Sequence, residues 1–424
     1  MTSATDGRLS IVVLCPHFDP DTAPTGVVMS RLVRELTLQG HRVHVVTTLP
    51  WYRDHRVDSR WTNVGWRNRT ETTPWGSITR LQPFAGTDRR NLLRRAAGFV
   101  GFSGLATVAA VSAGRRTEGR RPDAVIAMSP PLTLGVAAWI VARVRRAPLI
   151  FNVQDVFPDA AVATGAIRNR WVIRASRLLE KFVYRRSAAI TVLSDELADN
   201  VRGKLPRRMA GRVVTIPNFV DTSTIVPMDR GTRYRTELGL DDRPVVMYAG
   251  NVGFSQSLDL LIGAAREMPD VWFVVNGGGS ALESVRSEAE GLANVVFGDF
   301  QPIERLAEVL ATGDVHVVPL KRGLGSVSVP SKTYSIMAAG RPVVAAIDEG
   351  TEVRRLIERS GGGLSVAPDD AEAFADALRR VVRDPVLAGD MGRSARRLVE
   401  GEASPRSVAT AYADLIGRMA GFAG

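Results

Sequence analysis

Short apolar segments rich in β-branched residues recur along all 424 residues of the chain, and helical patterns separate them. The segments do not alternate polar with apolar residues, which indicates parallel strands covered by helices on both faces. The predicted strands span 9–15, 42–48, 123–128, 148–153, 188–193 and 212–217, then 244–250, 271–278, 294–299, 314–320, 342–346 and 363–366. This βαβα order occurs twice and predicts an α/β fold of two doubly wound, Rossmann-like domains.

The boundary between the two predicted domains lies in the segment 218–243, where polar, charged and turn-forming residues are concentrated. We expect an N-terminal domain over residues 1–222 and a C-terminal domain over 223–403. One more helix, about 404–419, follows after the second sheet is complete. We expect the segment 404–424 to cross back to the first domain.

The charge of the chain is divided unequally between its halves. The formal net charge is +11, but residues 1–225 carry +16 and residues 226–424 carry −5. This asymmetry indicates an anionic partner for the first half, such as a membrane, a lipid phosphate or a nucleic acid. We do not expect a nucleic acid, because the arginines flank an apolar helix rather than aromatic stacking residues. The single cysteine, Cys15, excludes an intramolecular disulfide.

One segment, 96–114, contains no charged residue and lies inside a longer predicted helix, about 89–121, whose ends are rich in arginine. This pattern has three interpretations. The first is a crossover helix packed on the sheet, the second is a helix in the membrane interface, and the third is a transmembrane span. The first ten residues lack the apolar core of a signal peptide, so we expect a cytoplasmic protein.

The first predicted strand leads into a loop with His17, Asp19 and Asp21, and a helix begins near Gly26. A glycine at a helix N-terminus offers backbone N–H groups to an anion or a sugar. The two aspartates resemble a D-x-D metal–nucleotide motif, but loop capping and contact with an incoming substrate are the other interpretations, and we expect no metal. No G-x-G-x-x-G follows the strand and no P-loop motif is present, which argues against a dehydrogenase and a P-loop enzyme.

Two more carboxylates, Asp155 and Asp159, follow the predicted strand 148–153. Both lie just beyond the carboxyl end of that strand, where doubly wound sheets commonly bind their ligands. Each carboxylate either takes part in a site or caps the helix that follows.

Four turns rich in glycine follow strands of the second predicted domain, in the segments 248–257, 276–280, 298–302 and 319–332. Glycine permits close backbone approach to a ligand. Lys332 lies in the first turn of a helix beside free backbone N–H groups, and together they suit a diphosphate. The residues that we expect to bind this ligand are Gly250, Asn251, Gly253, Gly277, Gly278, Asp299, Phe300, Lys321, Arg322, Ser331, Lys332 and Ser335.

Over almost the whole chain these motifs resemble the retaining family 4 glycosyltransferases of GT-B fold. The resemblance rests on the glycine loop at Gly26 and on IPNFVD (216–221), YAGN (248–251), NGGG (276–279), VVFGDF (295–300) and PLKRG…AAGRPVV (319–344). PHFDPDTAPTG, AMSPPL, QDVFPD and VPSKTYSIMAAGRPVV further resemble the subgroup that builds O-antigen, capsule and colanic-acid repeat units. That subgroup includes N-acetylfucosamine transferases.

The sequence departs from the family pattern in the residues that the family uses for chemistry. The two glutamates of the family's E-x7-E motif fall at Val327 and Ser335, and neither is a carboxylate. The Arg and Lys that hold the donor diphosphate in the family fall at Asn251 and Gln256. Lys332, with Lys321 or Arg322, is then the best remaining positive charge for the diphosphate.

The resemblance implies transfer of a sugar from a nucleotide diphosphate donor to a polyprenyl-diphosphate-linked or other lipid-linked saccharide in surface polysaccharide assembly. We expect the donor to be UDP-linked and its sugar to be an N-acetylated amino or deoxy sugar. Retention of configuration without metal or cofactor is implied as well. The enzyme would attach peripherally to the inner face of the cell membrane.

The resemblance also implies a division of roles between two domains that face a cleft. The C-terminal domain would bind the nucleotide sugar, with Lys332 stabilising the leaving group. The N-terminal domain would bind the acceptor near His17, Asp19, Gly26 and Asp159, and Asp155 is the candidate base. Two other functions stay open: a catalytically inactive GT-B scaffold of a glycan-assembly complex, and a UDP-sugar 2-epimerase with acid/base groups in the cleft.

Overall fold

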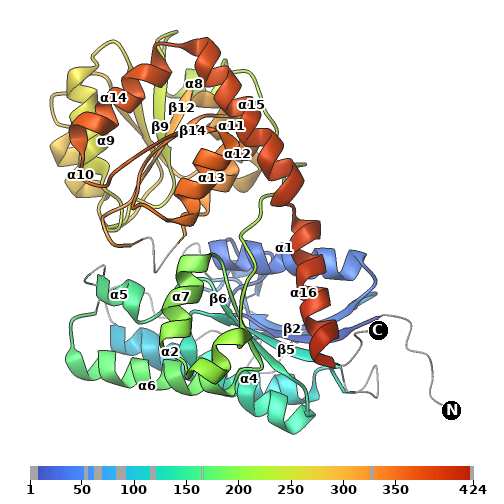
Figure 1. The fold of residues 1–424 in the computed structure, drawn as a ribbon. Helices are drawn as coiled ribbons and strands as arrows, with labels where there is room; N and C mark the ends of the chain where they lie inside the picture. Colours follow the sequence, from blue (N-terminus) through green and yellow to red (C-terminus); the bar gives the residue numbers. More distant parts are fainter. Residues whose placement is uncertain are drawn as a thin grey trace. The chain divides into compact units, whose positions relative to one another are not determined.

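The structure is a computed structural model that describes residues 8–51, 56–61, 69–82, 92–114, 121–163, 165, 167–324 and 329–420. Contacts between residues divide the chain into two compact units. Unit 1 consists of Met1–Val162, Ile167–Pro217 and Pro405–Gly424, and unit 2 consists of Ala163–Ala166 and Asn218–Ser404. Each unit contains one largely parallel sheet flanked by helices (Figure 1), so the predicted fold of two Rossmann-like domains is confirmed.

The sheet of unit 1 has eight strands in the order β3-β4-β2-β1-β5-β6-β7-β8. All neighbours are parallel except β3, which pairs antiparallel with β4 at the edge of the sheet. The strands are β1 (Ser10–Leu14), β2 (Arg42–Thr48), β3 (Arg69–Thr73), β4 (Gly76–Leu81), β5 (Ala124–Ser129), β6 (Leu149–Val153), β7 (Ala189–Val192) and β8 (Val213–Thr215). Strands β3 and β4 are absent from the predicted set, because polar side chains interrupt their apolar pattern.

Helices cover both faces of this sheet (Figure 1). On one face, α1 (Pro24–Leu38) packs against α16 (Pro405–Ala420). On the other face, α4 (Leu132–Arg145) packs between α2 (Leu92–Ser112) and α6 (Arg170–Arg186). Shorter helical segments are η1 (Ser59–Trp61), α5 (Asp159–Ala163), α7 (Asp195–Gly203) and η2 (Arg207–Arg212).

Helix α2 corresponds to the uncharged segment of the sequence and packs on the sheet, as the crossover interpretation predicts. Its Phe102, Ala106 and Ala110 are buried, and it contacts α4, β1, β2 and β4. Residues 83–91 and 115–120 lie outside the described residues, so most of the flanking arginines do as well. Within the described part of the chain, no helix combines the length and the apolar character that crossing a bilayer requires.

The C-terminal helix α16 belongs to unit 1, as predicted. The Tyr412 hydroxyl accepts a hydrogen bond from Asn152 Nδ2 in β6 at 2.6 Å and lies 3.0 Å from Thr191 Oγ1 in β7. Val408, Leu415 and Ile416 of the same helix are buried. Helix α16 therefore contributes to the core of unit 1.

The sheet of unit 2 has six parallel strands in the order β11-β10-β9-β12-β13-β14. They are β9 (Val245–Ala249), β10 (Trp272–Asn276), β11 (Val295–Gly298), β12 (Val315–Pro319), β13 (Val343–Ala346) and β14 (Gly363–Val366), all within predicted segments. The helices are α8 (Arg233–Glu237), α9 (Leu258–Glu267), α10 (Leu282–Glu288), η3 (Ile303–Arg305), α11 (Leu306–Thr312), α12 (Lys332–Ala338), α13 (Glu352–Ser360), α14 (Ala371–Val382) and α15 (Pro385–Glu402). A large core cluster of this unit is mostly aliphatic and includes the buried rings of Tyr248, Phe273 and Phe374.

Candidate functional site

Three of the glycine-rich turns of unit 2 follow neighbouring strands at one edge of the sheet. Asn276 at the end of β10 pairs with Ala249 of β9 and with Gly298 of β11, so the turns after these strands begin at the same level. Backbone hydrogen bonds continue beyond the strands, from Gly250 N to Asn276 O at 2.9 Å and from Gly277 N to Gly298 O at 2.8 Å. The sequence-predicted turns are therefore brought together at the carboxyl ends of parallel strands.

The turn after β10 approaches the turn after β9 so closely that position 277 requires a glycine. Its φ is +134°, and a Cβ built on it would lie 2.0 Å from the carbonyl oxygen of Gly250. Any other residue would face both backbone strain and a clash with the neighbouring main chain. The ring of Phe300 lies against this turn, about 3.4 Å from the same Cβ position, and its side chain is exposed. Asp299, the preceding residue, is exposed as well.

Lys332 reaches from the start of α12 to the turn after β9. Its Nζ donates a hydrogen bond to the Tyr248 hydroxyl at 2.7 Å and another to Gln256 Oε1 at 3.0 Å. The Tyr248 hydroxyl in turn donates to the carbonyl oxygen of Asn251 at 2.6 Å. The same Nζ lies 3.4 Å from the position that a Cβ on Gly250 would take. The lysine therefore fixes the glycine turn that follows β9.

The ammonium group of Lys332 has no counter-ion among the described residues. Its recorded partners are a hydroxyl, an amide oxygen and the face of the Tyr248 ring, 3.9 Å from Nζ to the ring centroid. Burial lowers the pKa of Lys332 to about 7, because the charged form loses its hydration without gaining an opposite charge. An anion bound here would restore the ordinary, charged state of the lysine.

The other two predicted cations, Lys321 and Arg322, follow β12. The backbone N–H of Lys321 donates to Ser255 O at 3.0 Å, so this segment is attached to the turn after β9, and the Lys321 side chain is exposed. Arg322 is held elsewhere, since its guanidinium donates to Pro368 O at 2.8 Å and to Asp369 Oδ2 at 3.3 Å. Of the two, Lys321 has the side chain that is available to a ligand.

The remaining predicted residues of unit 2 lie in the turns after β9 and β10 and at the start of α12. Asn251 is exposed and Gly253 is buried in the turn after β9, and Gly278 lies against the Phe300 ring. Ser331 precedes α12 and makes no side-chain capping hydrogen bond, and Ser335 is a half-buried residue one turn into the helix. Val327, the other position of the missing glutamates, lies outside the described residues.

In unit 1, residues of the loop after β1 and of the start of α1 contact one another. His17 Nδ1 lies 2.7 Å from Asp21 Oδ2, both side chains are largely buried, and the His17 ring lies beside Trp51. Gly26, in the first turn of α1, approaches the His17 side chain so closely that a Cβ would lie 2.8 Å from His17 Cβ. Gly26 therefore serves the packing of this loop, and the structure brings it together with His17.

Asp19 is held in this loop by its main chain. Its N–H donates to Ser30 Oγ at 2.8 Å and its carbonyl oxygen accepts from Arg80 Nη2 at 2.6 Å, while the side chain stays exposed. Arg80 in β4 is buried and also pairs with Glu71 at 3.3 Å. The two aspartates of the D-x-D pattern thus have different environments. Among the described residues, no group of three His, Cys, Asp or Glu side chains is arranged to hold a metal ion.

Asp159 and Asp155 differ as well. Asp159, the first residue of α5, forms an ion pair with Lys204 at 2.7 Å, and Lys204 also pairs with the buried Glu180 at 2.6 Å. Burial raises the pKa of the Glu180 carboxyl despite this pairing. Asp155 is half-buried just beyond β6. Arg177 Nη2 lies 3.9 Å from Asp159 Oδ1, so Asp159 belongs to a cluster of two cations and two carboxylates.

Sequence reasoning did not assign a role to several residues that shape these sites. Tyr248 and Gln256 hold Lys332, and Arg80 and Lys204 hold the loops of unit 1. For Tyr248 a signal was present, because a tyrosine at the end of a buried parallel strand needs a partner for its hydroxyl. For Arg80 no local signal was present, because polar residues interrupt the apolar pattern of β4 and the segment is not predicted as a strand.

Models of two protein families match the chain. The "Glycosyl transferase 4-like domain" matches residues 25–218, and "Glycosyl transferases group 1" matches residues 243–384. A relative from Escherichia coli K12, named "Putative colanic acid biosynthesis glycosyl transferase WcaI", is 26% identical over 393 residues, which cover 89% of this chain and 93% of the relative.

Solved structures show the same fold at low sequence identity. Sucrose-phosphate synthase from Thermosynechococcus elongatus superimposes with a TM-score of 0.75 at 20% identity, covering 98% of this chain and 100% of the other. HepE of Anabaena, in complex with UDP and glucose, gives a TM-score of 0.70 at 14% identity, covering 97% of this chain and 100% of the other.

Proposed function

Because the chain belongs to family 4 of the glycosyltransferases and has the GT-B fold, we propose that it transfers a sugar from a UDP-linked donor to a lipid-linked saccharide. The acceptor would be a polyprenyl-diphosphate-linked or similar saccharide in the assembly of a cell-surface polysaccharide. The name of the relative WcaI supports this pathway, and the UDP bound to HepE supports the nucleotide. The sugar would be an N-acetylated amino or deoxy sugar.

The observation that carries this proposal is the uncompensated ammonium of Lys332 at the glycine turn after β9. A lysine beside a glycine turn, where the main chain permits close approach, suits the two phosphates of a nucleotide sugar. Gly250, Gly253, Gly277 and Gly278 permit the close approach, and Phe300 offers an exposed ring beside the turn. Asn251, Asp299, Lys321, Arg322, Ser331 and Ser335 complete the proposed donor site.

In the proposed reaction the bond between the anomeric carbon and the donor phosphate breaks, and an acceptor hydroxyl forms the new bond on the same face. Negative charge accumulates on the departing diphosphate, and Lys332 stabilises it there. The proton of the acceptor hydroxyl passes to the departing phosphate, or to Asp155 if a protein base takes part. Attack on the face that the phosphate leaves retains the configuration of the anomeric carbon, and in this proposal Lys332 supplies the positive charge without a metal.

Unit 1 would bind the acceptor, near His17, Asp19, Gly26 and Asp159. The net charge of +16 on residues 1–225 supports this assignment, because a lipid-linked diphosphate is anionic. Peripheral attachment to the inner face of the cell membrane would bring the acceptor within reach.

Thermal unfolding of the purified protein with UDP-, GDP- and TDP-sugars, with and without EDTA, tests the donor. A ligand at ~100 times its Kd stabilises the folded state by about 2.7 kcal/mol. We expect a shift that is selective for UDP-sugars, insensitive to EDTA, and lost in Lys332→Ala. Lys332→Arg retains the charge and should keep part of the shift, and no shift with any nucleotide in the unaltered protein would refute the donor site.

A second candidate function is a catalytically inactive scaffold with the same fold. It is favoured by Ser335, which occupies the position of a glutamate that the family uses. Nucleotide binding without sugar transfer, in the presence of a lipid-linked acceptor, would support the scaffold over the enzyme.

A further inference from the structure

Helix α6 has an exposed face that is both cationic and apolar. Its seventeen residues include six Lys or Arg and one acidic residue, Glu180, which is buried and paired with Lys204. The cations Arg170, Arg174, Arg177, Lys181, Arg185 and Arg186 are all exposed. Arg177 lies 3.9 Å from Asp159 of α5, and the other five cations carry positive charge that no ion pair among the described residues offsets.

Large apolar side chains accompany these cations. Trp171 and Leu178 of α6 are each 64% exposed, and Val172 is 42% exposed. The neighbouring helix α4 adds the exposed Val144 and Arg143, without any acidic residue of its own. Half of the large apolar side chains that are exposed in the described part of the chain lie on α2, α4 and α6, three helices on one face of one sheet.

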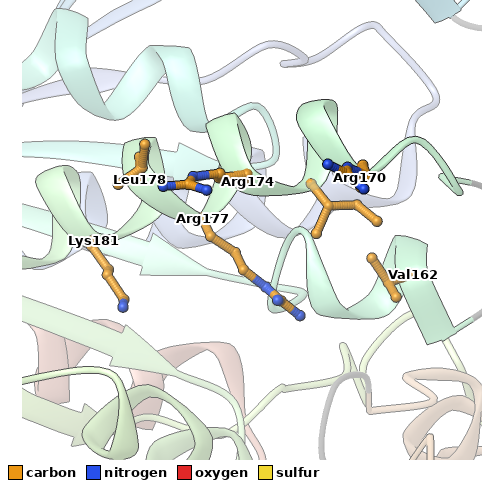
Figure 2. A pocket seen from close by; sticks show the side chains of 7 residues that line it. Val162, Arg170, Arg174, Arg177, Leu178 and Lys181 are labelled. Atoms are coloured by element: carbon orange, nitrogen blue, oxygen red, sulfur yellow. The ribbon is translucent and has the colours of Figure 1, made fainter.

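A hollow of about 520 Å³ runs along this face of α6 (Figure 2). Its lining combines the cations Arg170, Arg174, Arg177 and Lys181 with the apolar Ile173, Leu178 and Val162. The lining residues of α6 are spaced alternately three positions and one position apart, which places them on one side of the helix. The side chain of Arg177 extends from α6 to the side where Val162 of α5 lies (Figure 2).

Buried residues and one aromatic contact anchor α6 in unit 1. Val183 and Tyr184 are buried, and Phe182 makes an edge-to-face contact with Trp139 of α4 at 5.1 Å between ring centroids. The Asn169 side chain caps the first turn by accepting hydrogen bonds from the N–H groups of Trp171 and Val172. The exposed cations and apolar side chains thus belong to a helix that is packed against unit 1 and capped at its first turn.

We propose that the exposed face of α6 docks unit 1 onto an anionic phospholipid surface, with headgroup phosphates against the cations of the hollow and Trp171 and Leu178 in the interfacial layer. Tryptophan is a typical interface residue, and basic side chains bind headgroups while their aliphatic parts follow the apolar layer. A bilayer is favoured over a nucleic acid, since the apolar side chains alternate with the cations and Trp171 is the single aromatic residue on the exposed face.

This inference deepens the proposed function, because a lipid-linked acceptor is met at a membrane surface. It assigns that contact to α6, whereas the apolar pattern of the sequence drew attention to α2. Lipid binding and donor binding lie on different units, so each can fail without the other.

Vesicle flotation of the full chain tests the inference. The probe is a vesicle with about 30% phosphatidylglycerol in phosphatidylcholine, compared with pure phosphatidylcholine, in the absence of nucleotide. We expect binding to the anionic vesicle alone, weakened by high salt. Arg170→Gln/Arg174→Gln/Lys181→Gln should weaken it about 100-fold, at ~1 kcal/mol for each basic residue near the surface. All three side chains are exposed, so the variant should unfold at an unchanged temperature and keep its response to UDP-sugars.

Two further variants make the test specific. Arg380→Gln/Arg393→Gln/Arg397→Gln removes the same charge from exposed positions of unit 2 and should leave flotation unchanged. Trp171→Phe should reduce the quenching of tryptophan fluorescence by brominated phosphatidylglycerol. Equal loss of binding in both triple variants would overturn the proposal. So would loss in Val100→Ser/Val108→Ser of α2 but not in the α6 variant, or tighter binding of a short DNA duplex than of the vesicle.

Discussion

The two units treat charge at the carboxyl ends of their strands in opposite ways. In unit 1, His17 lies beside Asp21, and Asp159 and Glu180 share Lys204. In unit 2, the ammonium of Lys332 is paired with neutral oxygens, and the surrounding turns are glycines in close backbone contact. A charged residue just beyond a strand therefore has two uses, and the presence of a counter-ion distinguishes them. The neutralised charges of unit 1 hold loops, whereas Lys332 lies without a counter-ion at the turn where we propose that the donor binds.

The largest expected effect comes from breaking the neutralised cluster of unit 1. Lys204→Met leaves the carboxyl of Glu180, 1% exposed, without its cation. Removing one partner of a buried ion pair costs about 3–5 kcal/mol, and the free energy of unfolding should fall by that order. Denaturant unfolding followed by circular dichroism measures it.

The double variant Lys204→Met/Glu180→Gln is the control for this prediction. It removes the buried charge together with its partner and should recover a large part of the loss. A single variant as stable as the unaltered protein would mean that the cluster does not hold the loop before α5.

Gly277→Ala should cost about 2–3 kcal/mol in the stability of unit 2. The new methyl group meets the Gly250 carbonyl, and the residue must keep a positive φ. Gly263→Ala is the matched control, because Gly263 lies inside α9 with nothing within 4 Å of the Cβ position. That change should stabilise the protein by about 0.5–1 kcal/mol. Differential scanning calorimetry compares the two, and similar transition temperatures would argue against tight packing of the turns.

Lys332→Ala should weaken binding of a UDP-sugar about 10- to 100-fold, since a hydrogen bond to a charged group contributes about 1.5–3 kcal/mol. Isothermal titration calorimetry measures this directly. Lys321→Ala, a change of an exposed lysine on the neighbouring segment, should have a smaller effect. A larger effect at Lys321 than at Lys332 would move the diphosphate away from the turn after β9.

Binding of the UDP-sugar should also depend on pH through Lys332. With the pKa of the free lysine at about 7, the ammonium is lost as pH rises above that value, and affinity should fall by up to about tenfold per pH unit. The ligand-free protein should change in the opposite direction. Between about 7 and the ordinary value of 10.5 the unfolded chain binds the extra proton, so stability rises with pH. Lys332→Arg should flatten both profiles, and a flat profile in the unaltered protein would contradict the assignment.

The smallest effect is expected at Asp19. Its main chain is held by Ser30 and Arg80, but its side chain is exposed, so Asp19→Ala should change the free energy of unfolding by less than about 0.5 kcal/mol. Thermal unfolding tests this. Arg80→Ala is the contrasting change, because it removes the hydrogen bond to the Asp19 carbonyl oxygen. A loss of stability at Asp19 equal to that at Arg80 would show that the carboxylate, too, holds the loop.

The sequence predicts the fold well because each buried parallel strand is a short apolar segment that can be recognised without knowing its neighbours. Segments such as 244–250 and 342–346 are continuously apolar, and the structure contains strands there. The hairpin β3–β4 escapes this reasoning, since Thr79 and Arg80 are polar yet buried. Their burial depends on partners such as Glu71 and Asp19, which only the folded chain brings near.

For the candidate site, position was predictable and pairing was not. Glycine spacing after apolar strands located the turns around Gly250 and Gly277. The sequence contains no sign that Asp159 is paired with Lys204, or that Lys332 is held by Tyr248, because these partners are far apart along the chain. Long-range pairing decides which charges are neutralised, and it is a property of the folded state.

The path of the chain through the two units has a consequence for the order in which they form. Unit 1 is not one continuous segment: the chain leaves it after Pro217, builds unit 2, and returns at Pro405. A ribosome therefore releases α16 only after all of unit 2 has emerged. Until then Asn152 and Thr191 lack the Tyr412 hydroxyl, and the surface that α16 covers is open to solvent. Unit 1 therefore cannot complete its core before residues 405–420 have been synthesised, by which time unit 2 can already fold. A fragment that ends before residue 405 lacks α16 and leaves that surface of unit 1 exposed.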